Sequence, residues 1–498
     1  MNTMEDLLDL LRKATLGLID GRKNKDVRYS CLDSVLSAFA SLWTQNPSFL
    51  FHQRRMEKNF GKSNMSTLFG VAKIPTDKQI GSFLDRINYR EFNQIFYDVI
   101  SYLDSKEKLD LFKVLNNEYY TLAMGESKFF SSNKIHYINY EETDSNNYEY
   151  IDSENYEDNY EDTGSKKGHI NYVRNVLQAA LVSPKTNLVL PLAPQFKEKD
   201  DSKTKQNYEN IALTSWFDNN LSNLCNIIGD TRLIILTEDI FSGDLLSWQS
   251  FLELIDNKNL NYILCCQENS HKEIKKFINS GVIDSFTCYK EVDGFTEPKR
   301  HTFSWLNNLL IRNNIGFSQI NCFSLTIEDV FKRKVEVSDN SSLKQGKTKR
   351  SLTTVYEDVT FTWITNFVID KSNIVDYSDI GRSRWKIEDN NFKVAKNKRY
   401  NVTHQFVVKD KYIINTLLTL NFIAFSFYNA LFIVDEYWLL ARKKYYNKKF
   451  KDYNFYSYLG ALLDTSVFQT FSELTLNMCG IKYQPECLSN IMVEEQEK

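Results

Sequence analysis

The chain has 498 residues, a net charge of −3, and an ordinary globular balance of 42% hydrophobic and 25% charged residues. This length allows two or three domains with a large core. The eight cysteines include no CxxC pair, which argues against a disulfide framework and against zinc-ligand spacing. The first residues, MNTMEDLLDLLRK, are acidic and amphipathic, unlike a secretory signal, so we expect a cytoplasmic location.

The negative charge is concentrated in one tract. Residues 141–162, EETDSNNYEYIDSENYEDNYED, hold ten acids and no base, so the rest of the chain carries about +7. The tract lacks an apolar pattern, and we expect a disordered loop over residues 141–166. Such a loop could imitate DNA charge and cover a basic groove, or it could be an insertion without a role.

The first part of the chain, residues 1–110, has the pattern of a helical region. Apolar residues recur at helical spacing in Leu7–Ile19, Leu32–Trp43 and Phe92–Leu103. Thr76 or Asp77 is a suitable cap for a further helix. Basic residues beside aromatic ones around His52 suit a small helical DNA-binding module, but a plain helical bundle has the same pattern.

Residues 111–285 alternate between strand and helix patterns. Strands are predicted at Tyr119–Met124, Lys134–Tyr140, Val173–Val182, Leu188–Leu192, Arg232–Glu238 and Tyr262–Cys266. Helices are predicted at Asn207–Leu224, Leu245–Ile255 and His271–Ile278.

Two acids stand at the end of a predicted central strand. The run RLIILTE at 232–238 is continuously apolar, which is typical of a strand buried on both faces. It ends in Glu238 and Asp239, where open α/β sheets bind their ligands. A capping role at a helix start is the alternative explanation for these acids.

A β-rich region follows over residues 286–370. Strands without helices between them are predicted at Thr287–Val292, His301–Trp305, Ile320–Ile327 and Thr360–Ile369. The basic segment SSLKQGKTKR at 341–350 suits contacts to backbone phosphates, although a solvated charged turn has the same composition.

The segment Arg382–Phe406 has helical spacing and an unusual charge pattern. Trp385, Phe392 and Ala395 would form its buried stripe. Arg384 and Glu388 are four residues apart and would share one helix face. A carboxylate on such a helix, followed by a basic run, suits a metal-dependent site that handles phosphate. A surface ion pair on an amphipathic helix is the alternative.

The remaining chain is predicted to be helical. Lys409–Arg442 includes the apolar run Ile413–Val434, which we expect to be a buried core helix, with membrane insertion as the minor alternative. Ala441–Tyr458 interleaves lysines with aromatic residues, a pattern that can neutralise phosphates and stack on bases. Leu459–Met478 is predicted to be the last helix.

The sequence RWKIE at Arg384–Glu388, with Phe392 and a lysine downstream, resembles the signature around the third acid of DDE transposases. These are the insertion-sequence transposases of bacteria. Other segments resemble the same family in the same order. They are Phe39–Ile87, NKIHY at 133–137, LVLPLAP at 188–194, YILCCQENSH at 262–271, FSWLNNLLIR at 303–312 and LLTLNFIAF at 417–425.

The resemblance implies a site of three carboxylates that hold two Mg²⁺ or Mn²⁺ ions for strand cleavage and transfer. Asp239 and Glu388 would be the retained metal ligands and catalytic acids. Gly125 stands where the family has its first Asp, and the neighbouring Glu126 is the candidate replacement. The resemblance implies that Arg384 and Lys396 contact DNA. The further basic residues Arg399, Lys443 and Lys444 are candidates for nucleic-acid binding by their place in basic segments.

The resemblance also implies an α/β fold: an RNase H-like core with a mixed five-stranded sheet, a β-rich insertion, and helical N- and C-terminal regions. The expected division is 1–110, 111–285, 286–370, 371–435 and 436–498. The implied function is DNA transposition, impaired by the change at Gly125, and the alternative is an inactive relic that binds DNA or another partner. Expected partners are element-end and target DNA and further copies of the chain, a homodimer or larger assembly, at the nucleoid and without a membrane.

Overall fold

The computed structural model describes residues 3–19, 28–46, 49–57, 63–132, 141–144, 170–196, 205–229, 232–238, 245–266, 284–292, 294–312, 317–338, 350–394, 413–446 and 453–481. Several predictions concern residues outside these ranges. They are the strand Lys134–Tyr140, the helix His271–Ile278, most of the basic segment 341–350, and the site residues Asp239, Lys396 and Arg399.

The N-terminal region is helical, as predicted. Its helices are α1 (Thr3–Leu16), α2 (Cys31–Trp43), α3 (Phe49–Glu57), α4 (Asn64–Thr67), α5 (Asp77–Leu84) and α6 (Asn93–Ser105), with the short turns η1 (Tyr89–Phe92) and η2 (Leu109–Phe112). Thr76 is the cap of α5: its hydroxyl accepts from the backbone N–H of Gln79, and the Gln79 side chain accepts from the backbone N–H of Thr76.

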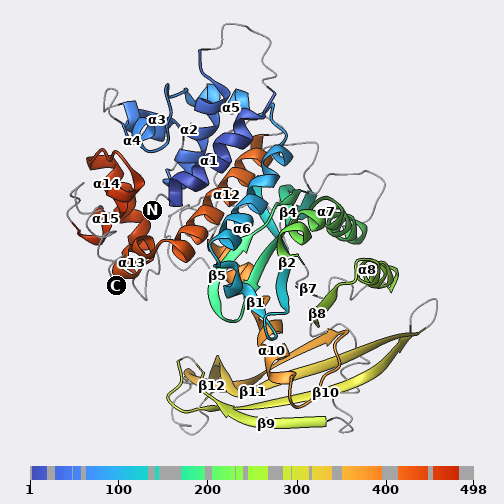
Figure 1. Cartoon of the computed structure of the whole chain (residues 1–498). Coiled ribbons are helices and arrows are strands. Elements are labelled where there is room, and N and C mark those ends of the chain that lie inside the picture. The colour runs from blue at the N-terminus through green and yellow to red at the C-terminus, as the bar shows by residue number, and fades with distance from the viewer. Residues whose placement is uncertain are drawn as a thin grey trace, which may run out of the picture.

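The apolar helix α12 (Ile413–Val434) is a core helix, as expected. Among the described helices it alone is long and apolar enough to cross a membrane, but 89% of its apolar window is buried inside the protein. It lies between the N-terminal helices and the sheet (Figure 1). The Tyr428 ring stacks on Trp43 of α2 at a centroid distance of 4.9 Å, which ties the C-terminal part of the chain to the N-terminal helices.

The described residues after α12 form three helices, whereas the sequence predicts one, Leu459–Met478, beyond the helical stretch Lys409–Arg442. α13 (Glu436–Tyr445) is capped by the carboxylate of Asp435, and α14 (Tyr453–Thr465) follows. A break then separates α14 from α15 (Phe471–Cys479), so the single helix predicted over Leu459–Met478 is wrong. The hydroxyl of Thr470 accepts from the backbone N–H of Glu473 and starts the new helix.

The central sheet is mixed, and the fold is α/β. Five of its strands lie in the order β5 (Thr186–Pro191), β4 (Ile170–Ser183), β2 (Tyr119–Ser132), β7 (Arg232–Glu238) and β8 (Asn261–Cys265). β2, β7 and β8 are parallel, whereas β4 is antiparallel to β2 on one side and to β5 on the other. The short strands β1 (Lys113–Val114) and β6 (Gln195–Phe196) pair with β2 and β4. The prediction of a buried central strand at 232–238 is confirmed.

The acidic tract departs from its prediction at its start. Glu141–Asp144 is a strand, β3, which pairs antiparallel with the first residues of β4. A strand edge offers unpaired backbone N–H and C=O groups, so even a polar segment gains hydrogen bonds there. The expected loop over residues 141–166 is therefore wrong for its first four residues, and residues 145–166 lie outside the described ranges.

Four antiparallel strands continue the same sheet beyond β8 and form a layer at its far end (Figure 1). They are β9 (Asp284–Lys290), β10 (Lys299–Arg312), β11 (Phe317–Ser338) and β12 (Arg350–Thr365), in the order β12-β11-β10-β9. β12 joins this layer to β8 through the pairs from Trp363–Cys265 to Thr365–Ile263. The β-rich character predicted for residues 286–370 is confirmed.

One face of this layer is apolar and the other is rich in hydroxyl groups. Phe303, Phe323 and Trp363 line the apolar face, and α10 (Ile374–Ser383) packs there with Gly381 against the Trp363 ring. On the other face the strand registers align two rows of Ser and Thr across four strands. The rows are Thr287, Thr302, Thr326 and Thr360, and Ser285, Ser304, Ser324 and Thr362.

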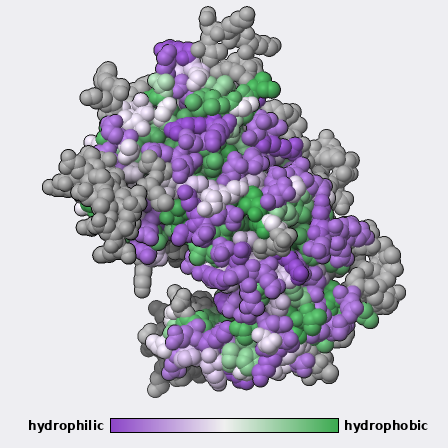
Figure 2. Space-filling view, in the orientation of Figure 1, coloured by the Kyte–Doolittle hydropathy of each residue, from purple (hydrophilic) through white to green (hydrophobic). Residues whose placement is uncertain are grey.

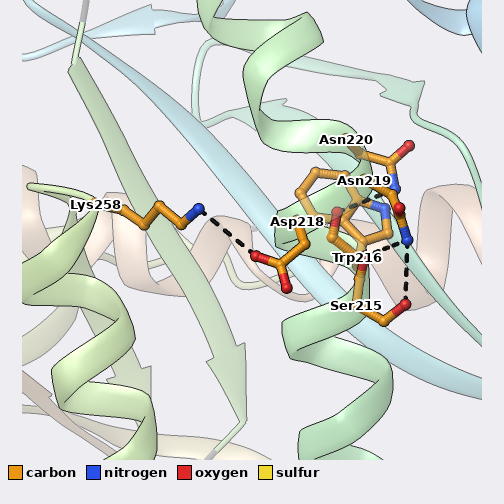
Figure 3. A network of polar contacts seen from close by, with 6 residues as sticks. All are labelled: Ser215, Trp216, Asp218, Asn219, Asn220 and Lys258. Carbon is orange, nitrogen blue, oxygen red and sulfur yellow. Dashed lines mark hydrogen bonds and ion pairs between the residues drawn. The ribbon is translucent and has the colours of Figure 1, made fainter.

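Helices α7 (Lys205–Ile228) and α8 (Leu245–Asn257) lie beside the central strands (Figure 1). Figure 3 shows the ion pair that links α7 to the end of α8, with the Lys258 ammonium 3.6 Å from the Asp218 carboxylate. Within α7, the Asn220 amide donates to the Trp216 carbonyl. The hydroxyl of Tyr97 on α6 donates to Asn220, so α7 is also tied to the N-terminal helices. On the face shown in Figure 2, hydrophobic residues are scattered among hydrophilic ones.

Candidate active site

The segment that carries Arg384 and Glu388 is less regular than the long helix its spacing predicts. α10 ends at Ser383, and a π-helical turn, η3 (Ile387–Phe392), follows. Residues after Val394 lie outside the described ranges, so the predicted helix is not continuous over its described part. π-Helical turns are rare and occur frequently at functional sites, because the wider turn displaces side chains from regular helical positions.

Arg384 and Glu388 form an ion pair, with 2.8 Å between Nη1 and Oε1. The Arg384 side chain is only 2% exposed, whereas that of Glu388 is 34% exposed. The pair is therefore not the exposed surface pair that the alternative interpretation predicted. Removing a buried guanidinium from water is costly unless a partner compensates, and Glu388 is such a partner. Arg384 thus holds Glu388 in place, and its burial leaves it poorly placed for the expected contact with DNA phosphate.

The neighbouring Trp385 is exposed, contrary to the predicted buried stripe. Its side chain is 45% exposed, and the Arg384 guanidinium lies over its ring at 5.2 Å from the centroid. The predicted stripe assumes regular α-helical spacing. Because α10 ends at Ser383 and a π-helical turn follows, the residues after Ser383 do not keep that spacing. Phe392, the next member of the stripe, is buried as predicted.

Two side chains fasten this segment to the turn between β4 and β5. The Lys386 ammonium donates to the carbonyls of Ser183 and Thr186 at 2.6 and 2.7 Å. Asn390 donates to the carbonyl of Asn187 at 2.7 Å. Burial lowers the pKa of Lys386 to about 8, because a charged ammonium loses hydration there. These contacts fix the position of Glu388 relative to the sheet.

A third contact reaches the middle of the sheet. The Asn391 amide donates to the Gln178 side chain of β4 at 2.8 Å, and both residues are fully buried. Gln178 pairs directly with Gly125 of β2 in the antiparallel ladder, so both belong to the face that η3 covers. Buried amide groups are stable only when they are hydrogen-bonded, so this contact favours the position of η3 in which Asn391 reaches Gln178.

Gly125, the position expected for a first acid, faces apolar side chains. A Cβ atom built at Gly125 would lie 3.3 Å from Cε2 of Phe392 and 3.4 Å from Cγ2 of Ile387. The position is therefore turned toward the Glu388 segment, and the space beside it is filled. Successive residues of a strand point to opposite faces, so Glu126 is directed to the other face of β2.

Strands β2 and β7 pair in parallel from Tyr119–Arg232 to Ala123–Leu236. Gly125 of β2 and Glu238 of β7 each stand two residues beyond the last of these pairs. Glu238 is the last residue of β7, so the expectation that an acid stands at the end of this central strand is met.

The described residues do not provide the metal site that three carboxylates would form. Within the described part of the chain, no group of three His, Cys, Asp or Glu residues is arranged to hold a metal ion. Glu388 is the candidate ligand on η3, while β2 offers no carboxylate on the face toward it.

The remaining predicted residues lie on α13. Lys443 and Lys444 are both exposed, which suits a contact with phosphate. The Lys444 ammonium also donates to the carbonyls of Met478 and Cys479 at the end of α15, so part of its role is to hold these helices together.

Sequence reasoning missed four residues that position the candidate site: Gln178, Lys386, Asn390 and Asn391. Lys386 and Asn390 were visible as polar residues beside Glu388, but their partners are backbone carbonyls about 200 residues earlier in the chain, which no local spacing reveals.

No family model matches the chain, and no curated protein matches it either.

Proposed function

We propose that this chain is a DNA-binding protein of the DDE transposase type, with an RNase H-like core whose acid cluster is broken on β2. The order β5-β4-β2-β7-β8, with only β4 antiparallel to β2, is the strand arrangement expected for that core. The Arg384–Glu388 pair supports the same assignment, because it occurs where the resembled signature predicts it.

The observation that carries the proposal is the environment of Gly125. A carboxylate at this position would point at Phe392 and Ile387, and burying it there without a partner would be costly. Glu126 does not replace it, because its side chain leaves the opposite face of the strand. The Glu388 segment is therefore positioned but has no acid opposite it on β2, which favours binding of DNA without cutting it.

The DNA contacts in this proposal come from basic residues outside the acidic tract. Lys443 and Lys444 on α13 are exposed, and Lys396 and Arg399 follow η3 in the sequence. Contacts of this kind are made to phosphates, so they release counterions and weaken steeply as salt rises. Such a protein would be cytoplasmic and associated with the nucleoid, and would bind as a dimer or larger assembly.

The test of DNA binding uses duplexes taken from both sides of the gene and one of shuffled sequence. We expect binding with a salt dependence that falls when Lys443 and Lys444 are both changed to Gln. A matched control is Lys106→Gln and Lys108→Gln, which removes two charges from the end of α6. Absence of binding at low salt, or an equal effect of both double variants, would contradict the proposal.

The test of the broken acid cluster restores the missing carboxylate. Gly125→Asp combined with Phe392→Leu makes room for an acid opposite Glu388, and Gly125→Ala with Phe392→Leu is the matched control without a carboxylate. We expect the parent protein to bind DNA without cutting it in Mg²⁺ or Mn²⁺. Cleavage by the Asp variant alone would support a lost first acid, whereas cleavage by the parent protein would overturn this part of the proposal.

A second candidate function is metal-dependent cleavage and transfer by the chain as it stands. It is favoured by the Arg384–Glu388 ion pair and by Glu238, the acid that ends β7. Calorimetry with Mg²⁺ or Mn²⁺ separates it from the first candidate. Under the second, binding is lost in Glu388→Gln, and cleavage is lost in Asp239→Asn and Glu126→Gln.

A further inference from the structure

Strand β9 is the outer edge of the sheet. It pairs with β10 in an unbroken register from Asp284–Trp305 to Lys290–Lys299. Among the described residues, no strand pairs with its other side, and it lies at the outer end of the molecule in Figure 1. An edge of this kind presents a row of backbone N–H and C=O groups that can pair with another strand.

The sequence of β9, DSFTCYK, lacks the usual protection of an edge. Its charges stand only at the two ends, and the five central residues include no charge, proline or glycine. Natural edge strands are commonly blunted by a central lysine, a proline or a bulge. β9 has instead the β-favouring residues Phe286, Thr287 and Tyr289, and Tyr289 is 71% exposed.

The sequence is also complementary to itself when it is reversed. In an antiparallel pair centred on Thr287, Asp284 lies opposite Lys290 of the second copy, Ser285 opposite Tyr289, and Phe286 opposite Cys288. Opposite charges and apolar–apolar neighbours are the favourable cross-strand pairs. We propose that β9 pairs with β9 of a second copy of this chain, about a two-fold axis at Thr287.

The charges inside one copy favour this pairing. The direct neighbour of Lys290 across the β9–β10 ladder is Lys299, a like charge, which is unfavourable. The Lys290 ammonium lies 3.9 Å from Asp379 and 5.6 Å from the centre of the Phe303 ring, so its positive charge is only partly balanced. Asp284 of a second copy supplies a carboxylate on the open side.

Alternative registers are poorer. Moving the centre by one residue, to Phe286 or Cys288, pairs only five residues of each strand and separates Asp284 from Lys290. If the pair were centred between two residues, the apolar face of one copy, which packs on α10, would lie on the same side of the joined sheet as the hydroxyl face of the other copy. The Thr287 register uses all seven residues and aligns the two hydroxyl faces side by side. The inference does not depend on DNA binding.

Cross-linking tests this register. In the proposed dimer, the two Thr287 residues face each other at a Cα–Cα distance of about 5 Å, which suits a disulfide. The two Ser285 residues would be about 14 Å apart along the strands. Under mild oxidation we expect Thr287→Cys to form a covalent dimer, while Ser285→Cys and the parent protein with its native cysteines do not.

A mixture of Ser285→Cys and Tyr289→Cys proteins should also form a covalent dimer, because these positions are opposite each other. Equal cross-linking of Thr287→Cys and Ser285→Cys would indicate random collisions and overturn the proposed register. Cross-linking of neither Thr287→Cys nor the mixture would overturn the proposal.

Charge reversal tests the same pairing without cysteine chemistry. Seven paired residues bury little area, so we expect a weak dimer in analytical ultracentrifugation. Asp284→Lys should weaken it about tenfold, because two favourable ion pairs become repulsive. Adding Lys290→Asp should restore it. The matched control Glu291→Lys makes the same charge change just beyond β9 and should leave dimerisation unchanged.

A central lysine provides a second way to close the edge. Thr287→Lys should abolish the dimer, since two ammonium groups would meet at the axis. Thr302→Lys, the same change on the same face of β10, should preserve it. Circular dichroism confirms that each variant is folded. A parent protein that stays monomeric at high concentration, or equal loss in both lysine variants, would refute the pairing.

Discussion

The two sides of the candidate site have opposite chemistry. On the η3 side, charged and amide groups are kept and fastened: Arg384 holds Glu388, and Lys386 holds the β4–β5 turn. On the β2 side, Gly125 lies beneath Phe392 and Ile387, and the interface is apolar. The difference shows that a carboxylate can be positioned by a well-built segment even where the strand opposite it contributes only packing.

Of the two sides of the candidate site, the apolar side should contribute more to the free energy of unfolding. Phe392→Ala is expected to cost about 3 kcal/mol of unfolding free energy, because it removes a buried ring and leaves a cavity above Gly125. Urea denaturation measures this loss. The control Trp385→Ala removes a larger but exposed ring and should cost about 1 kcal/mol or less. If the two losses are equal, the ring of Phe392 is not packed as described.

The second prediction joins the two sides. Gly125→Asp should cost about 2 kcal/mol, because the new carboxylate crowds and is buried against the Phe392 ring. In the Phe392→Leu background the same change should cost about 1 kcal/mol less, since contacting residues are energetically coupled. A double-mutant cycle in urea measures the coupling. Additive losses would mean that position 125 does not face Phe392.

The polar side is expected to contribute less. Glu388→Gln should cost about 1 kcal/mol, because the buried Arg384 keeps a neutral acceptor but loses its counter-charge, and solvent reaches the exposed part of Glu388. Asp389→Asn, which disrupts the exposed pair with Lys393, should cost about 0.5 kcal/mol or less. A larger loss of unfolding free energy in Asp389→Asn than in Glu388→Gln would contradict this prediction.

The parts predicted from sequence are those set by local pattern. The apolar run at 232–238 gives a central strand, and the uniform apolarity of Ile413–Val434 gives a core helix, because both patterns report burial directly. The spacing of Arg384 and Glu388 gave their ion pair. The end of α10 at Ser383, the exposure of Trp385 and the filling of space beside Gly125 depend on contacts between distant segments, which the spacing of residues does not encode.

The last prediction concerns the pH dependence of the Lys386 contact. Its pKa is lowered to about 8 in the folded protein, while the unfolded chain has an ordinary lysine pKa near 10.5. Below pH 8 the ammonium is charged in both states, and the folded state bears the full cost of burying it. Between pH 8 and 10.5 the unfolded chain binds more protons, so the contribution of Lys386 to stability rises with pH.

The difference in stability between the parent protein and Lys386→Met isolates this group from the other titrating residues. We expect the parent to gain stability relative to Lys386→Met as the pH rises from 8 to 10.5, with no relative change from pH 6 to 7. Lys386→Arg, which stays charged throughout, should show no such gain against Lys386→Met. A flat difference across this range would mean that the two carbonyls of the β4–β5 turn stabilise the ammonium enough to offset its burial.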